Sequence, residues 1–208
     1  GQPVTIHDPN DATALGIGMV HQHFKLVECF TVLQNIILGV EPNKSGFLSM
    51  GEARKKVVEL SEKYGLQIDP DAVIEDITVG MQQRTEILKM LYRDNDILIF
   101  DEPTAVLTPQ ETERLFDVLR RMRSDGKAII IITHKLHEVL AISARVAILR
   151  KGAYVGDIAT RDATEAKLTE MMVGEKVELN IDRPEPVNPV KRLDIAHLTV
   201  RSAEGITV

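Results

Sequence analysis

The chain has 208 residues, of which 44% are hydrophobic, and its 25 Lys and Arg against 31 Asp and Glu give a formal net charge of −6 at pH 7. This hydrophobic content excludes an intrinsically disordered chain, and the single cysteine, Cys29, excludes a disulfide framework. The acidic balance argues against a general nucleic-acid binder, which would carry a surplus of basic residues on one face.

Helix starts are marked by side chains that can cap the first amides of a helix. The pairs Ser49 with Glu52 and Thr108 with Glu111 both have the spacing of a capping box, in which each side chain accepts from the other residue's backbone N–H. Thr164 provides a third cap. These starts predict helices over residues 53–63, from 109 to a stop at 126, and from 164 to 173.

Runs rich in Ile, Leu, Val and Phe predict buried strands over residues 96–101, 128–133 and 145–149. The first two are almost entirely apolar, as expected where helices cover both faces of a parallel sheet. A turn at Lys151 and Gly152 then predicts a hairpin with a further strand over 154–158. Helices that alternate with such strands indicate an α/β fold with a largely parallel sheet.

The composition changes after residue 174, where three prolines lie close together: Pro184, Pro186 and Pro189. Proline removes a backbone donor and stops helices, so we predict a linker over 175–190. Residues 1–174 are expected to form one unit, with a mainly helical part over about 25–93. Beyond the linker, residues 191–208 are predicted to contain the opening strand of a further structural unit.

Two adjacent carboxylates, Asp101 and Glu102, follow directly on a predicted buried strand. The carboxyl ends of parallel strands meet at one edge of the sheet, where ligands bind in open α/β folds. His134 follows the next predicted strand and is expected at the same edge. One carboxylate could hold Mg²⁺ and the other could deprotonate an attacking water, so this combination suits phosphoryl transfer.

At this point the chain resembles the ATP-binding cassette (ABC) ATPases, and the resemblance covers nearly every residue. Five motifs occur in the order and spacing of that family: a glutamine loop at Gln22, a signature over 77–84, a Walker B strand with its glutamate over 97–102, a D-loop over 105–108 and a histidine switch at His134. The resemblance implies a P-loop NTPase-like core sheet with an inserted helical subdomain.

The resemblance also implies ATP and Mg²⁺ as ligands. Asp101 would serve the magnesium, and Glu102 would be the general base. His134 would contact the γ-phosphate, and Gln22 would sense both the metal and the water. These groups suit a reaction in which catalysis is mainly positioning and charge compensation.

In the family, the signature binds the γ-phosphate of ATP held by the opposite cassette. The residues that this implies here are Thr78, Val79, Gly80, Met81 and Gln82, with a helix that starts near Met81. The usual Ser-Gly-Gly-Gln pattern is altered by Thr78, Val79 and Met81. The D-loop residues are Ala105, Val106, Leu107 and Thr108, and Thr108 stands where Asp is usual.

The phosphate-cradling pattern G-x-x-x-x-G-K-[ST] is absent from these 208 residues. In the family it precedes the glutamine loop, which would place it before Gly1, and residues 1–6 resemble the strand that follows it. We therefore expect a fragment of a first cassette that is inactive alone, with a second cassette beginning near residue 191. The sequence around the Walker B and signature segments most resembles tandem-cassette importers of simple sugars and nucleosides.

Such a protein would lie peripherally on the cytoplasmic face of the membrane. Its partners would be membrane-spanning permease subunits, a second cassette and, indirectly, a solute-binding protein, with no nucleic acid. Two alternatives stay open: a soluble ABC ATPase without a transport role, and a non-catalytic interaction module.

Overall fold

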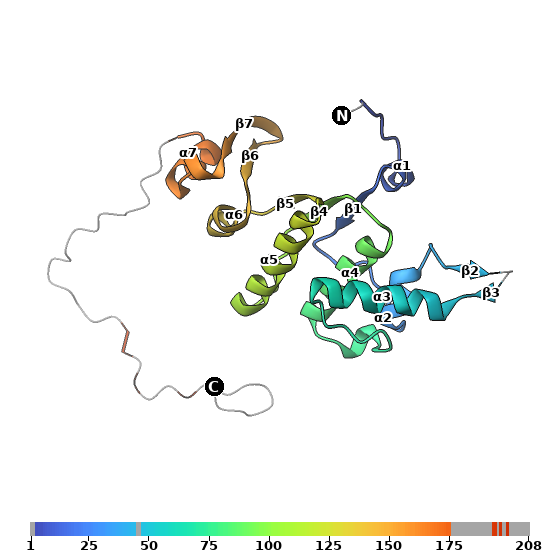
Figure 1. Cartoon of the computed structure of the whole chain (residues 1–208). Coiled ribbons are helices and arrows are strands. Elements are labelled where there is room, and N and C mark those ends of the chain that lie inside the picture. The colour runs from blue at the N-terminus through green and yellow to red at the C-terminus, as the bar shows by residue number, and fades with distance from the viewer. Residues whose placement is uncertain (1–2, 45–46, 176–192, 195, 197–198, 200–208) are drawn as a thin grey trace.

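The computed structural model of the chain describes residues 3–44, 47–175, 193, 194, 196 and 199, with only the backbone of Lys44, Phe47 and Leu48 (Figure 1). The predicted linker over 175–190 and the predicted strand over 191–208 therefore lie almost entirely outside the described residues. Within the described part, no helix is long and apolar enough to cross a membrane.

A three-stranded parallel sheet lies at the centre of the described chain (Figure 1). Its order is β1 (Ile17–Val20), β4 (Ile97–Asp101), β5 (Ala128–Ile132). Both outer strands pair in parallel with β4, so the carboxyl ends of all three strands lie at one edge. The predicted α/β fold with a parallel sheet is thereby confirmed, and that edge is where its ligands are expected.

The two faces of this sheet differ. On one face Leu98 and Phe100 are fully buried, in a core shared with α4 (Val79–Tyr92) and α5 (Pro109–Ser124). The other face carries apolar side chains that are partly exposed: Met19 at 37%, Ile130 at 50% and Ile132 at 48%. The expectation that helices cover both faces is thus wrong for the described residues, in which only one face is packed.

Between β1 and β4 the chain is mainly helical. Two helices from this stretch, α2 and α3, pack against α4 and form the helical side of the molecule in Figure 1. The elements are α2 (Val32–Ile37), a small hairpin of β2 (Asn43–Lys44) and β3 (Phe47–Leu48), α3 (Met50–Tyr64) and a 3₁₀ turn over Ile74–Asp76.

The remaining elements lie at the two ends of the described chain. A short helix, α1 (Pro9–Ala14), leads into β1. After β5 come α6 (Leu136–Ile142), an antiparallel pair of β6 (Arg145–Arg150) and β7 (Ala153–Ala159), a 3₁₀ turn over Thr160–Asp162, and α7 (Glu165–Val173). The predicted hairpin turn is confirmed, because Lys151 and Gly152 both have positive φ, 49° and 79°, as a type I′ turn requires.

The two predicted capping boxes have different outcomes. At the start of α5, Glu111 N donates to Thr108 Oγ1 at 3.3 Å and Thr108 N donates to Glu111 Oε2 at 3.0 Å, so this box is closed. Ser49 is the N-cap of α3 but makes no capping hydrogen bond. Its ψ of 70° differs from the 159° of Thr108, which explains why an identical spacing fails there.

We expect Thr108→Ala to lower the free energy of unfolding by about 1 kcal/mol, because it removes a closed N-cap. Ser49→Ala is the matched control, because the Ser49 side chain forms no capping hydrogen bond. Its free energy of unfolding should stay within about 0.5 kcal/mol of that of wild type. Urea denaturation of the two variants tests this. Equal losses in both variants would contradict the prediction.

The structure also contains a strand that the sequence did not reveal. β1 carries Gly18 in its middle, and glycine is depleted in strands. The glycine is required by packing, because a Cβ there would lie 2.9 Å from the side chain of buried Asn95. Conversely, the strand expected over residues 1–6 does not form in residues 3–6, the part that is described.

A polar contact ties the end of α3 to the end of α5. Asp125 accepts a hydrogen bond from the Tyr64 hydroxyl at 2.8 Å and forms an ion pair with Lys63 Nζ at 2.6 Å. The hydrogen bond from Lys63, and then that from Tyr64, lowers the pKa of the Asp125 carboxyl below its ordinary value of 3.8. The helical side of the molecule is therefore joined to α5 by a contact that needs an ionised carboxylate.

A lowered folded-state pKa contributes stability that is present above the unfolded pKa and lost as the pH falls through the folded value. We therefore expect Asp125→Asn to lose less stability than wild type between pH 7 and about pH 3. Urea midpoints at the two pH values measure the difference. An identical acid dependence in both proteins would show that the contact does not contribute.

Candidate active site at the carboxyl edge of the sheet

Glu102 lies directly after β4 in an unusual backbone conformation. Its φ is 47°, a left-handed value that non-glycine residues rarely adopt and that often marks a functional position. The loop is fixed to the neighbouring strand, because Glu102 N donates to Ile132 O at 2.9 Å. One carboxylate oxygen, Oε2, is buried and has no hydrogen-bond partner among the described residues. That oxygen retains its capacity to accept a proton or a hydrogen bond.

The structure brings His134 to the same place. His134 Nδ1 lies 2.8 Å from Glu102 Oε1, and the imidazole is 71% exposed whereas the carboxylate is 19% exposed. When the carboxylate is ionised it can only accept, in which case Nδ1 donates to it and Nε2 is left available toward solvent. The prediction that His134 lies at the same edge of the sheet as Glu102 is confirmed, and the direct contact between the two side chains goes beyond it.

Asp101 is the last residue of β4 and is half-buried. Its carboxylate makes no hydrogen bond or ion pair with the residues that the structure describes. Among these residues there is also no group of three or more His, Cys, Asp or Glu that could hold a metal ion. Mg²⁺ commonly keeps several waters and takes only one or two carboxylates with substrate phosphate oxygens, so an unpaired carboxylate here fits that ion.

Gln22 lies two residues beyond β1, the strand next to β4. It is therefore at the same edge of the sheet as Asp101 and Glu102. Its side chain is exposed and makes no hydrogen bond to any described residue. The structure thus places Gln22 near the edge but does not join it to the Glu102 and His134 pair.

The signature residues form the start of α4, and the helix begins earlier than predicted. It starts at Val79 instead of near Met81, because Thr78 is the N-cap and accepts from Met81 N at 3.4 Å. Thr78 and Val79 are exposed, and Gly80 is buried. The Gln82 side chain is held within the chain, because its Nε2 donates to Ile74 O at 3.2 Å.

Gly80 has a role within the chain that the sequence did not reveal. A Cβ at this position would lie 2.7 Å from Glu111 Oε1, so the glycine makes room for the carboxylate of the α5 capping box. The hydrogen bond from Thr108 N, and then that from its hydroxyl, lowers the pKa of Glu111 below its ordinary value. No local pattern could have found this contact, because the two residues lie on different helices.

The D-loop connects Glu102 to α5. Ala105 and Val106 are exposed, Val106 by 63%. Leu107 packs against the core, and Thr108 caps α5. Its tip is therefore accessible, whereas its second half is fixed by packing and capping.

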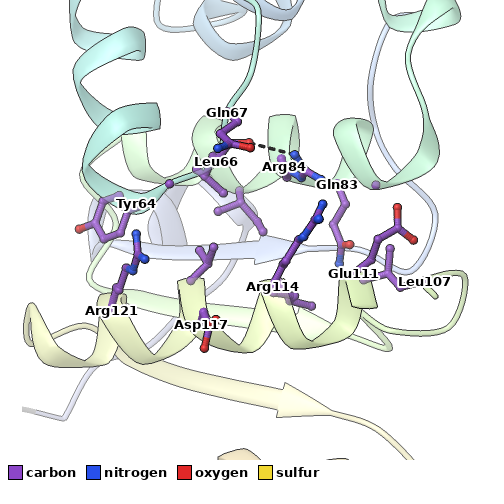
Figure 2. Close-up of a pocket in the computed structure, with 15 residues that line it drawn as sticks. Tyr64, Leu66, Gln67, Gln83, Arg84, Leu107, Glu111, Arg114, Asp117 and Arg121 are labelled. Carbon is purple, nitrogen blue, oxygen red and sulfur yellow. Dashed lines mark hydrogen bonds between the residues drawn. The ribbon is translucent and has the colours of Figure 1, made fainter. Parts of the chain in front are cut away.

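A cavity of about 130 Å³ lies behind the signature, between the end of α3, α4 and α5 (Figure 2). Arg84, Arg114 and Arg121 line it together with apolar side chains, and Figure 2 shows Arg121 beside Tyr64. Neither Glu102 nor His134 lines this cavity. The candidate active site is therefore an open edge of the sheet and not the enclosed space.

One polar cluster at the site was not singled out from the sequence. It consists of Thr104, Lys135 and Glu138, which contact one another and lie close in the chain to Glu102 and His134. Thr104 and Glu138 are buried, with exposures of 1% and 5%. A charged residue in the first turn of a short helix gave no sign of this burial in the sequence.

Comparisons with known proteins agree with these motifs. The profile of the family described as ABC transporter matches residues 1–105. The chain is 47% identical over 205 residues to the nucleoside import ATP-binding protein NupA of Lactococcus lactis subsp. cremoris, covering 99% of this chain and 40% of that protein. It is 48% identical over 206 residues to the guanosine import ATP-binding protein NupO of Bacillus subtilis, again covering 99% and 40%.

A third relative is the glucose import ATP-binding protein TsgD13 of Haloferax volcanii, 42% identical over 222 residues, with 92% of this chain and 40% of that protein covered. The chain thus spans about 40% of the length of these curated relatives. Among solved structures it resembles the dimeric bacterial ABC transporter cassette MJ0796, with a TM-score of 0.63 and 25% identity over 76% of this chain and 69% of that one. The chain therefore belongs to the ABC transporter family.

Proposed function

We propose that the full-length protein is the ATP-hydrolysing subunit of an ABC importer for nucleosides or simple sugars. The observation that carries the proposal is the Glu102 and His134 pair, 2.8 Å apart at the carboxyl edge of a parallel sheet. Its buried, unpartnered Glu102 Oε2 offers a proton acceptor where phosphoryl transfer requires one. Family membership supports ATP as the nucleotide.

In this proposal Glu102 is the general base. Its carboxylate accepts a proton from the water that attacks the γ-phosphorus, while the bond from that phosphorus to the β–γ bridging oxygen breaks and ADP departs. Because Nδ1 of His134 is engaged by Glu102, Nε2 would contact a γ-phosphate oxygen, to which it donates when the ring carries both protons. The exposed imidazole leaves that nitrogen accessible to a nucleotide.

Asp101 and Gln22 are the proposed residues for Mg²⁺. A carboxylate and an amide oxygen at one edge of the sheet are hard oxygen donors, which this ion prefers. When bound, the ion neutralises charge on the phosphate oxygens. Asp101 would supply the carboxylate, and the exposed Gln22 is free to approach or leave.

The exposed start of α4 is proposed to face a nucleotide held by a second cassette. Thr78 and Val79 are accessible, and the amino end of a helix favours an anion. Gly80, Met81 and Gln82 would complete this first turn of α4. The exposed half of the D-loop, Ala105 and Val106, would contact the second cassette.

The proposed partners are membrane-spanning permease subunits, with a solute-binding protein acting through them. The names of the relatives support import, and identities of 47% and 48% to the nucleoside and guanosine import proteins exceed the 42% to the glucose import protein. This order favours nucleosides as the solute class. The proposed location is the cytoplasmic face of the cell membrane, bound peripherally.

Three measurements on the full-length protein test the proposal. Phosphate release from ATP should depend on Mg²⁺ and disappear when the ion is chelated. The protein should co-purify with a polytopic membrane subunit, whereas a soluble ABC ATPase would not. Uptake of labelled nucleosides, but not of simple sugars, should be lost when its gene is deleted; the reverse result would assign the sugar branch.

A further inference from the structure

We propose that Thr104, Lys135 and Glu138 form a positioning network that holds Glu102 in register with His134. We name these three residues the polar triangle. None of them touches the proposed reacting atoms, so they are positioning residues and not catalytic ones. The inference rests on the proposed function, because it assigns the triangle to the geometry of the general base.

The three side chains contact one another on every side. Thr104 Oγ1 donates to Glu138 Oε2 at 2.6 Å. Lys135 Nζ lies 3.3 Å from Glu138 Oε1, and it donates to the Thr104 carbonyl at 2.8 Å and to Thr104 Oγ1 at 3.2 Å. The Lys135 ammonium therefore donates two hydrogen bonds and forms one ion pair within the triangle, and each carboxylate oxygen of Glu138 has a partner there.

Two members of the triangle are buried, the Lys135 side chain is 29% exposed, and the charges of Lys135 and Glu138 balance. Thr104 is 1% exposed and Glu138 is 5% exposed. A buried carboxylate is tolerated only when it is paired and hydrogen-bonded, and removing one partner leaves an uncompensated polar group. His137 Nε2 is the other titratable group near Glu138, at 4.0 Å from Oε1, and its ring is 73% exposed. The cluster therefore adds little net charge to the neighbouring phosphate site.

Its position in the chain links the two active-site loops. Thr104 follows Glu102 by two residues, and Lys135 directly follows His134. The pairing of β4 with β5 reaches only to Asp101 opposite Ile132, with one further bond from Glu102 N to Ile132 O. Beyond that bond the two segments have left the sheet, and the triangle connects them a second time beside the contact between Glu102 and His134.

This geometry gives the triangle a function that a generic core contact lacks. Glu102 sits between the last bond of the sheet and the triangle, in a left-handed conformation that must be held in place. A misplacement of about 1 Å in a catalytic group can cost on the order of a hundredfold in rate. Loss of the triangle should therefore lower the rate of the chemical step while leaving the nucleotide-binding surface intact.

The test uses Thr104→Val, which keeps the shape but removes the hydroxyl, and Thr104→Ser, which keeps the hydroxyl. In the full-length protein we expect Thr104→Val to lower kcat for ATP by about 10- to 100-fold with KM within about twofold of wild type. Thr104→Ser should restore kcat to within about threefold of wild type. Equal losses in both variants would overturn the proposal, because the hydroxyl would then be irrelevant.

Thr85→Val is the matched control. Thr85 is also fully buried, and its hydroxyl donates to Met81 O at 2.9 Å within α4. This substitution removes a buried hydroxyl hydrogen bond away from Glu102, so it should lower stability without lowering kcat. If it lowered kcat as much as Thr104→Val does, the effect would be general destabilisation and the proposal would fail.

A double-mutant cycle separates this proposal from the proposed function. In a Glu102→Gln background, Thr104→Val should cause no further loss of kcat, because the group that it positions is gone. A further loss equal to that in wild type would overturn the positioning role. If Glu102→Gln itself retained normal turnover, the general-base assignment would fail; if only Thr104→Val were without effect, the triangle alone would be refuted.

Discussion

Replacing Glu102 by Gln is expected to lower the ATP turnover of the full-length protein by about 10²- to 10⁴-fold, the range that general-base catalysis contributes. The amide fills the same space but cannot accept the proton of the attacking water. ATP binding should stay within a few-fold of wild type, because the base acts on the transition state more than on the ground state. Phosphate release and nucleotide titration together separate the two effects.

Glu113→Gln is the matched control for this substitution. Glu113 lies on the exposed side of α5 and makes no hydrogen bond or ion pair with the described residues. Glu113→Gln removes the same charge as Glu102→Gln but does so away from the sheet edge, so turnover should be unchanged. A similar loss in both variants would point to a general effect of charge and would remove the basis for the assignment of Glu102.

The largest expected effect on stability is that of Phe100→Ala, which should lower the free energy of unfolding by about 3–5 kcal/mol. Phe100 is fully buried on the central strand, directly before Asp101 and Glu102. Its removal leaves a cavity between the sheet and the helices that pack on it, and the neighbouring strands prevent the site from collapsing fully. Equilibrium urea denaturation measures the loss.

Leu149→Ala is the control for that measurement. Leu149 is 69% exposed on β6, so its truncation should change stability by no more than about 0.5 kcal/mol. If the two variants lost similar free energy of unfolding, burial of Phe100 on the packed face of the sheet would not be a main source of the protein's stability.

The reacting pair could be predicted from the sequence because each residue follows a strongly apolar strand. Parallel strands that are neighbours along the chain usually pair, so Glu102 and His134 were expected at one edge. The capping boxes show the limit of this reasoning. Thr108 and Ser49 have the same spacing to a glutamate, but only the backbone of Thr108 points its hydroxyl at the helix.

Features that depend on contacts between distant elements could not be predicted. β1 was missed because Gly18 weakens the strand pattern, and only the packing of Asn95 explains the glycine. The burial of Glu138 accompanies its hydrogen bond from Thr104 on another loop, so no local pattern around residue 138 predicts it. The sequence predicts a ligand-facing role for Gly80, and the closeness of Glu111 gives this glycine a second role within the chain.

The insertion of the helical stretch between β1 and β4 has a consequence for the order of folding. Pairing Val20 with Phe100 closes a loop of about 80 residues, whereas pairing Phe100 with Ile131 closes one of about 30, and the entropy lost on closure grows with loop length. We therefore expect the β4–β5 ladder to form before β1 docks. Glu102 and His134 both follow strands of that ladder, so they should come together before β1 brings Gln22 to the edge.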